Sequence, residues 1–318
     1  MQTFPTRRDF LRMSAVAAGA APFLLRSASA HATPLNLPIG IQAYTVGAEM
    51  NKDAAGTLRK VAQVGYKEVE ISPMSTIPNK DLRKALDDNG LKSPSGHHMI
   101  PDLMTKLQEH IDSAHELGQQ YMVITVPWVA DPSRFKSDSK DQGASFLAVL
   151  NNLTLDDWKW TAEQLNKIGE QVKKAGLQLG YHNHNIDFHP HGSTTGYDEL
   201  IRLTDAELVK LELDCGWMAL AGHSPAEYIA RHPDRYRMLH IKDFKKPAAP
   251  ITVLGGHGAD APAPTELGRG FVDYAPIFAA AKKGHIAHYF VEQEPPFTEM
   301  PATEAIQVDY DYLARLKA

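Results

Sequence analysis

The chain has 318 residues, 43% of them apolar and 22% charged, and its 33 basic and 38 acidic residues give a net charge of −5. These values are typical of a globular protein and exclude disordered, collagen-like and polytopic membrane classes. The acidic balance argues against a nucleic-acid partner, which would require a concentrated basic face. The single cysteine, Cys215, excludes an internal disulfide and a cysteine-rich metal site.

Residues 1–32 have the pattern of an export signal. The twin arginine Arg7-Arg8 precedes the apolar stretch 13–25, and small residues with Ala-x-Ala spacing follow. The stretch is shorter than the roughly 20 residues that a membrane-spanning helix needs. The pattern resembles a twin-arginine signal. We therefore expect the export machinery to be a partner, and the mature chain 33–318 to be periplasmic or secreted with no stable membrane anchor.

After this segment, short apolar runs alternate with amphipathic stretches, which predicts parallel βα units. Eight such pairs within about 285 residues predict a single α/β domain at 33–318, a (β/α)8 TIM barrel, and no break in composition indicates a second domain. The predicted strands are 39–44, 68–71, 92–96, 121–126, 177–182, 208–214, 238–242 and 287–292. The predicted helices are 52–64, 79–89, 101–117, 155–175, 196–204, 224–232, 271–283 and 302–316.

Two connections, 127–154 and 244–270, are much longer than the others. Both follow predicted strands, so in a barrel they would lie on the catalytic face and could act as lids. A disordered insertion is the other interpretation. For 247–264, which is rich in proline and glycine, both interpretations remain open.

Polar residues stand at the carboxyl ends of the predicted strands, where the sites of such barrels are assembled. Each has a structural explanation when taken alone: Asp214 could cap a turn, for example, and Glu292 could pair with Lys242. Ionisable groups that converge on one face need a cation or mutual pairing to offset their desolvation, so the joint pattern favours a shared metal site. The residues are Glu70, His97, His98, His182, His184, Asp214, His240, Lys242, Glu292 and Glu294.

From Ile39 to the C-terminus the chain resembles the xylose-isomerase-like TIM-barrel superfamily, the sugar phosphate isomerase/epimerase group. No single motif is specific, but their order along the strands is specific for the fold and the site face. The motifs are GIQAY at 40–44, GYKEVE at 65–70, GYHNH at 180–184, DF at 187–188, LDCGW at 213–217, HIKD at 240–243, LGRG at 267–270 and VEQE at 291–294.

The resemblance implies one divalent metal ion held by side chains from strands 5 to 8. Epimerases of the superfamily use Glu, Asp, His and Glu, and the last three correspond to Asp214, His240 and Glu292. The first position falls on His182, where this sequence departs from the epimerase pattern. Imidazole together with carboxylate suits Mn²⁺, Zn²⁺ or Co²⁺, whereas Mg²⁺ is less favoured.

The family chemistry acidifies a C–H bond beside a carbonyl that the metal polarises, and epimerases flank the substrate with two glutamates. Because His182 replaces the first of these, acid–base catalysis is expected from Glu292, His184, Glu294 or Lys242. The main prediction is a metal-dependent isomerase or epimerase of a non-phosphorylated sugar or keto-sugar. A single base also suits β-elimination, so a lyase or dehydratase of a keto-sugar, such as a 3-keto-glycoside, is the alternative.

The expected substrate is a small carbohydrate without phosphate, because phosphorylated sugars are mostly cytosolic. The sequence has neither a P-loop nor a dinucleotide fingerprint, which argues against a nucleotide cofactor. Substrate contacts are expected from Tyr44, Glu70, His97, His98, Trp217, Arg269 and Glu294.

The sequence allows two further interpretations. An exported sugar-binding protein with a vestigial site is one, although Asp214, His240 and Glu292 are all retained. The apurinic endonuclease branch of the barrel is the other, and the net charge of −5 and His182 argue against it. The sequence leaves open whether the barrel forms a homodimer.

Overall fold

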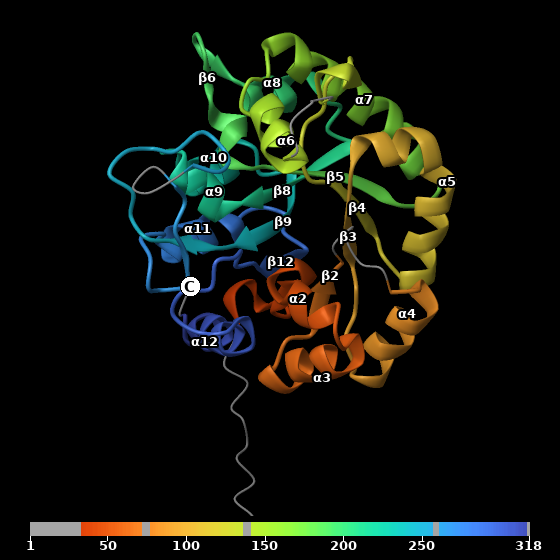
Figure 1. The fold of residues 1–318 in the computed structure, drawn as a ribbon, viewed down its shortest axis with the longest axis vertical. Coiled ribbons are helices and arrows are strands. Elements are labelled where there is room, and N and C mark those ends of the chain that lie inside the picture. Colours follow the sequence, from red (N-terminus) through yellow and green to blue (C-terminus); the bar gives the residue numbers. More distant parts are fainter. Residues whose placement is uncertain (1–32, 72–76, 136–140, 257–260, 317–318) are drawn as a thin grey trace, which may run out of the picture. The chain divides into compact units, whose positions relative to one another are not determined.

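A computed structural model of the chain describes residues 33–71, 77–135, 141–256 and 261–316. In these residues eight parallel strands form a barrel, and helices cover its outside (Figure 1). All eight predicted strands are present, with ends that differ by a few residues. They are β1 (Gly40–Gln42), β2 (Glu68–Glu70), β3 (Ser95–His98), β4 (Tyr121–Ile124), β5 (Gln178–His182), β8 (Val209–Asp214), β9 (Tyr236–Ile241) and β12 (His288–Val291).

The strands follow one another around the barrel in the order β2-β1-β12-β9-β8-β5-β4-β3. The first and last of these, β2 and β3, are joined by isolated parallel bridges and by backbone hydrogen bonds. Val69 N donates to Lys92 O at 2.8 Å, and His97 N donates to Ile71 O at 2.9 Å. These bonds close the barrel, and the predicted fold class is confirmed.

Each strand is followed by a helix, as predicted. Side chains cap several of the helices: Asp53 accepts from Gly56 N before α3, and Thr154 and Asp157 form a reciprocal capping box at α7. Gly118, with φ 76°, ends α5 in a left-handed conformation that glycine adopts without strain. The helices are α3 (Ala54–Val64), α4 (Asn79–Asp88), α5 (Ile100–Leu117), α7 (Leu155–Lys174), α8 (Gly196–Leu203), α10 (Pro225–Arg231), α11 (Tyr274–Ala281) and α12 (Ala302–Arg315).

The two long connections carry short elements that the sequence did not predict. The first contains α6 (Gln142–Leu150), and in the second β10 (Asp243–Phe244) pairs with β11 (Pro264–Thr265). The connections are bonded to each other, because Asn151 Nδ2 donates to Leu254 O at 3.0 Å and Leu254 N donates to Asn151 Oδ1 at 2.7 Å. Parts of both predicted lids, 136–140 and 257–260, lie outside the described residues.

Side chains inside the barrel form layers along its axis. At the amino ends of the strands, Glu68 Oε2 lies 2.8 Å from His288 Nδ1. An apolar layer of Val123, Met238 and Phe290 lies further along these strands. Because side chains alternate across a strand, the residues two positions beyond Met238 and Phe290, which are His240 and Glu292, also face inward. The apolar layer therefore separates the polar groups at the two ends of the barrel.

Within the described part of the chain, no helix is both long enough and apolar enough to cross a bilayer. The predicted export signal, 1–32, lies outside the described residues, so its cleavage, the export partner and the location of the mature chain stay predictions.

Candidate metal centre

The barrel brings four side chains together that come from four neighbouring strands. His182 ends β5, Asp214 ends β8, His240 lies on β9 and Glu292 follows β12. We call these four residues the ligand set. Each offers one nitrogen or oxygen atom, and these atoms all lie within 4.8 Å of one another. The predicted combination of residues is thus assembled at one end of the barrel.

The distances within the ligand set suit a divalent ion. His240 Nδ1 lies 3.1 Å from Glu292 Oε2 and 4.0 Å from Asp214 Oδ2, and His182 Nε2 lies 3.9 Å from the same oxygen of Asp214. Ligand atoms bonded to tetrahedral zinc at about 2.0–2.1 Å lie about 3.3 Å apart, which falls inside this range. These residues can therefore hold a metal with small side-chain adjustments.

Asp214 provides the observation that tests the fit most directly. Its Oδ1 accepts from Trp217 N at 2.7 Å and so caps α9 (Cys215–Leu220). Its Oδ2 is buried and has no hydrogen-bond partner among the described residues. A buried carboxylate oxygen needs a compensating charge, and the ammonium of Lys242 lies 3.3 Å from this atom, so Asp214 Oδ2 already faces a cation and has the position that a metal ligand requires. The turn-capping explanation of Asp214 is also correct, but only for its other oxygen.

A second polar layer, formed by Glu70, His97 and Glu212, lies behind the ligand set; we call it the inner layer. His97 Nε2 lies 2.8 Å from Glu70 Oε2 and 3.0 Å from Glu212 Oε2. Gln42 Nε2 also donates to Glu70 Oε2, at 2.8 Å, and Ser95 Oγ donates to Glu70 Oε1. Glu70 and Glu212 have no exposed surface; these bonds engage both oxygens of Glu70 and the Oε2 of Glu212, whereas Glu212 Oε1 has no hydrogen-bond partner among the described residues.

The two histidines of the ligand set join the two layers. His182 Nδ1 lies 3.0 Å from Glu212 Oε2, while its Nε2 faces Asp214. His240 Nε2 lies 2.7 Å from Glu70 Oε2, while its Nδ1 faces Glu292. Each ring therefore presents one nitrogen to the ligand set and the other to a carboxylate of the inner layer.

The electrostatics of the inner layer favour a charged histidine between two acids. Burial alone would lower the pKa of His97, but the adjacent Glu70 and Glu212 raise it to about 9. Burial and the neighbouring Glu70 raise the pKa of Glu212 to about 7. Burial opposes the ionisation of Glu70, yet His97 and His240 hold its pKa well below its usual range.

Beyond the strand ends, Lys242 connects the ligand set to a group of outer residues: Tyr44, Trp217 and Glu294. Its ammonium lies 3.3 Å from Asp214 Oδ2, 2.7 Å from Glu292 Oε2 and 2.5 Å from Glu294 Oε1. Burial would lower the pKa of Lys242, but these carboxylates raise it strongly. The lysine is therefore protonated at neutral pH.

The aromatic outer residues surround this lysine. The Lys242 ammonium lies 4.8 Å from the centre of the Trp217 ring, whose Nε1 donates to Glu294 Oε1 at 3.2 Å. Tyr44 is 39% exposed, and its pKa is raised by burial and by the nearby charges of Glu294 and Glu292. Tyr44 and Glu294 are thus the more exposed members of this group, whereas Trp217 is buried, and their contact with a substrate stays a prediction.

His184 lies on the same side of the site, just after β5. Its ring centre is 5.0 Å from that of His182 and 5.8 Å from that of Trp217. Its Nδ1 is buried without a hydrogen-bond partner among the described residues. Burial and the charge of Lys242 lower the pKa of His184 to about 3. The ring is therefore neutral near pH 7, with one unsatisfied nitrogen.

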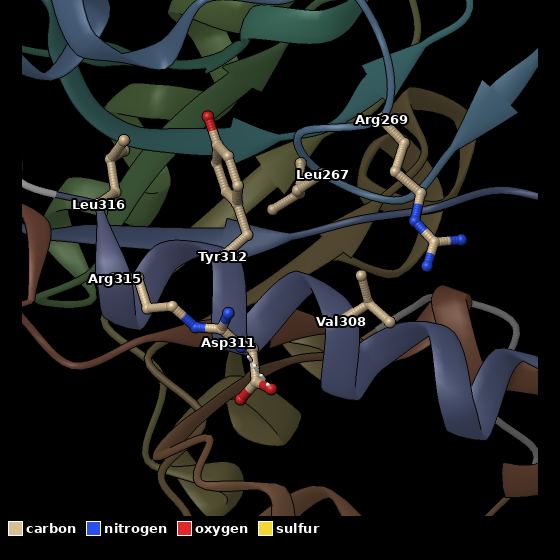
Figure 2. A pocket seen from close by; sticks show the side chains of 7 residues that line it. All are labelled: Leu267, Arg269, Val308, Asp311, Tyr312, Arg315 and Leu316. Carbon is tan, nitrogen blue, oxygen red and sulfur yellow. Dashed lines mark hydrogen bonds and ion pairs between the residues drawn. The ribbon is translucent and has the colours of Figure 1, made fainter.

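Two residues predicted to contact substrate lie elsewhere. His98 follows inward-facing His97 on β3, so it points outward, where its Nδ1 lies 3.2 Å from His110 Nδ1 of α5 and the residue lines a cavity of about 200 Å³. Arg269 pairs with Glu266 at 3.2 Å and lines a groove of about 400 Å³ along α12 (Figure 2). None of the described contacts of His98 or Arg269 is to the ligand set, and both assignments are therefore corrected.

Glu70 and His97 were also predicted to contact the substrate, but the structure gives them different partners. Both lie inside the barrel, but they bond to the ligand histidines rather than facing the outer residues. Glu212 was not predicted at all, although its acidic side chain in the apolar strand sequence Leu211-Glu212-Leu213 was a usable signal. An acid two positions before Asp214 must share its inward face.

A search of protein families matches residues 58–316 to the model described as xylose isomerase-like TIM barrel. The chain belongs to the xylose isomerase-like TIM barrel family. Among curated members, it is 31% identical over 255 residues to an inosose dehydratase of Clostridium perfringens, and the match covers 75% of this chain and 82% of the relative.

Solved structures of the family share the fold. A sugar phosphate isomerase/epimerase of Parabacteroides distasonis superposes with a TM-score of 0.68 at 23% identity, covering 87% of this chain and 98% of that one. The IolI protein with a zinc atom gives a TM-score of 0.63 at 16% identity, covering 86% and 96%. At these identities the similarity shows the barrel architecture alone.

Proposed function

We propose that the protein is a metal-dependent dehydratase of a cyclic polyhydroxy ketone, a keto-cyclitol or keto-sugar without phosphate. The observation that carries the proposal is the position of Lys242, a buried ammonium that contacts two members of the ligand set and Glu294. Elimination of water needs a base and an acid beside an activated carbonyl. The pair Lys242 and Glu294 provides both in direct contact.

His182, Asp214, His240 and Glu292 would hold the divalent ion. When bound, such an ion polarises the carbonyl of the substrate and increases the acidity of the neighbouring C–H bond. The buried Asp214 Oδ2 supports this assignment, because it accepts no hydrogen bond from the described residues and already faces a cation, the Lys242 ammonium at 3.3 Å.

The proton transfers can be assigned to the outer residues. Glu294 is a carboxylate with a partly exposed side chain, and it takes the proton from the carbon next to the carbonyl. The electron pair forms the new C=C bond while the C–O bond on the following carbon breaks. Lys242 donates a proton to the departing hydroxide, which leaves as water. Proton transfer from Glu294 to Lys242 along their contact then restores both groups.

His184 and Trp217 are proposed to position the substrate. A neutral His184 can hydrogen-bond a sugar hydroxyl through its unsatisfied Nδ1. The Trp217 ring can pack against the apolar face of a carbon ring. Lys242 is held by carboxylates. It is therefore not free to pair with a phosphate group of a substrate, which favours a substrate without phosphate.

The comparisons support elimination more than isomerisation. The curated relative at 31% identity is named an inosose dehydratase, and inosose is a cyclic polyhydroxy ketone. Isomerisation or epimerisation of a free sugar remains the second candidate, because the first step, proton removal beside a polarised carbonyl, is the same. The structural relative from Parabacteroides distasonis is named a sugar phosphate isomerase/epimerase, but its similarity to this chain extends to the fold alone.

One experiment distinguishes elimination from isomerisation or epimerisation by the products that form. Protein loaded with Mn²⁺, Zn²⁺ or Co²⁺ is incubated in D₂O with a keto-inositol, 3-keto-glycosides and free sugars, and the products are followed by NMR. Loss of a hydroxyl with formation of a C=C bond supports the dehydratase. Deuterium uptake without loss of a substituent identifies an isomerase or epimerase instead, and no reaction with any of them contradicts both.

We also propose that residues 1–32 direct export of the folded protein through the twin-arginine pathway. The support is the twin arginine and the apolar stretch that follows it. Replacing Arg7 and Arg8 with lysine should retain the protein in the cytoplasm. N-terminal sequencing of the exported form should begin near residue 31 or 33.

A further inference from the structure

The inner layer contains a carboxylate that neither the family resemblance nor the proposed chemistry assigns. Glu212 lies on β8, two residues before Asp214, and has no exposed surface. Its Oε2 lies 3.0 Å from His97 Nε2, 3.0 Å from His182 Nδ1 and 3.3 Å from His240 Nε2. One carboxylate oxygen therefore lies close to nitrogens of three imidazole rings.

Two groups of side chains in this region have atoms close enough together to hold a metal. One is the ligand set, and the other consists of His97, His182, Glu212 and His240. The groups share His182 and His240, but they use opposite nitrogens of each ring. In the second group, hydrogen bonds to Glu212 already engage His97 and His182, and His240 Nε2 is bonded to Glu70. In the first, Asp214 Oδ2 accepts no hydrogen bond from the described residues and faces the Lys242 ammonium at 3.3 Å.

We propose that Glu212 is a positioning residue for the metal centre, which fixes the ring of His182 and the nitrogen it presents. Ionised Glu212 only accepts hydrogen bonds, and with the carboxylate in this form the Nδ1 of His182 that faces it carries the proton. The lone pair then lies on Nε2, which faces Asp214. Carboxylates that accept from a ligand histidine in this way orient the ring and strengthen it as a ligand.

His182 depends on Glu212 more than His240 does on either acid. The described contacts of His182 Nδ1 include one carboxylate oxygen, that of Glu212. His240 Nε2 instead has Glu70 Oε2 at 2.7 Å in addition to Glu212 at 3.3 Å. Loss of Glu212 should therefore release the His182 ring while His240 stays bound to Glu70. The inference rests on the proposed metal site but not on the proposed reaction.

The test measures metal affinity rather than turnover. Zn²⁺ and Co²⁺ dissociation constants are determined by chelator competition for the full chain and for Glu212→Ala and Glu212→Gln. We expect Glu212→Ala to weaken binding about 10- to 100-fold and to alter the visible spectrum of the Co²⁺ form. Glu212→Gln keeps an oxygen that accepts from Nδ1, so it should recover most of the affinity and the wild-type spectrum.

Glu68→Gln is the matched control. Glu68 is also a buried glutamate in contact with a histidine, His288 Nδ1 at 2.8 Å, but at the opposite end of the barrel. It should change neither the affinity nor the Co²⁺ spectrum, even if it lowers the thermal stability as much as the Glu212 variants do.

Three outcomes would overturn the inference. Unchanged affinity and spectrum in Glu212→Ala would show that the carboxylate does not position His182. Complete loss of binding in both Glu212 variants, equal to that in Asp214→Asn, would make Glu212 a ligand. Absence of metal binding in the wild-type chain would remove the metal site itself and the proposed function with it, whereas the first two outcomes leave that function intact.

Discussion

The ammonium group of Lys242 lies 2.7 Å from Oε2 of Glu292, with no exposed surface on the lysine. The contact joins the end of β9 to the end of β12. It neutralises part of the negative charge that Asp214, Glu292 and Glu294 bring to the site. Buried ionic groups of this kind depend on each other, because removing one leaves the others without compensation.

The first prediction concerns this lysine. Lys242→Met should lower kcat by about 10²- to 10⁴-fold, because the variant loses the proposed proton donor. It should also lower the free energy of unfolding by about 3 kcal/mol, since buried carboxylates are left without their cation. Steady-state kinetics and urea denaturation measure the two effects.

Lys210→Met serves as the control for this variant. Lys210 is also buried and lies on the neighbouring strand β8, but it pairs with Glu207 before that strand. Its loss should leave kcat within about threefold of wild type, far below the range expected for a lost acid. A Lys242→Met protein with wild-type turnover would contradict the proposed role.

The second prediction concerns His240, whose Nδ1 faces Glu292 and whose Nε2 faces Glu70. His240→Ala should abolish metal retention and turnover together, because it removes a ligand and the contact between the ligand set and Glu70 of the inner layer. Metal content is measured by mass spectrometry after dialysis. His288→Ala, which removes a histidine paired with a buried glutamate at the other end of the barrel, should retain the metal. Equal metal content in His240→Ala and wild type would count against the ligand set.

The third prediction is a pH dependence of stability at Asp309 of α12. Its Oδ1 accepts from Leu267 N at 2.7 Å, and its Oδ2 is buried with no partner among the described residues. Burial raises the pKa of Asp309 to about 7. The folded protein therefore keeps this proton while the unfolded chain, with a pKa of about 3.9, loses it. Stability consequently falls as the pH rises from about 4 to 7.

Asp309→Asn should remove this contribution, because asparagine is neutral at every pH and its oxygen can still accept from Leu267 N. The stability of the variant relative to wild type should increase by about 2–4 kcal/mol between pH 4 and pH 8. Urea denaturation across that range measures the difference. Asp311→Asn, at a more exposed position of the same helix, is the control. A difference independent of pH would refute the interpretation.

The fourth prediction tests the packing that holds Lys242 in place. A Cβ atom at Gly216 would lie 2.6 Å from the carbonyl oxygen of Lys242 and 2.9 Å from its Cβ. Gly216→Ala must therefore displace the end of β9, and it should cost about 1–3 kcal/mol of stability and lower kcat. Gly47→Ala, where no atom lies within 4 Å of the added carbon, should be neutral. Calorimetry measures the stability of the two variants, and steady-state kinetics measures their kcat.

The barrel could be predicted from the sequence because each strand and helix has its own local pattern. Some of the buried parallel strands are apolar runs, such as Tyr121–Ile124, and several helices end at a glycine such as Gly118. The short elements could not be predicted in this way. α6 and the β10–β11 pair lie in long connections and depend on contacts with other parts of the chain, such as the bonds between Asn151 and Leu254.

The ligand set lies where the strand-end pattern and the resemblance predicted it, because ends of adjacent parallel strands meet at one face. Side-chain direction was harder to predict. His97 and His98 are adjacent in the sequence, yet one bonds to the inner layer and the other to α5. Only the register of β3 decides which of them faces inward, and the predicted strand 92–96 ended before both. Glu212 was missed for a different reason: it lies inside the predicted strand 208–214 rather than at its end, where polar residues were looked for.

The paired bonds between Asn151 and Leu254 have a consequence for protein engineering. A segment around residue 254 transplanted from another barrel would lose both partners unless an asparagine accompanied it at position 151. Asn185 adds a second tether, since its amide donates to the carbonyls of Ile251 and Val253. Chimeras should therefore exchange the segments around Asn151, Asn185 and residues 251–254 together. Recombination that separates these segments should yield poorly folded proteins.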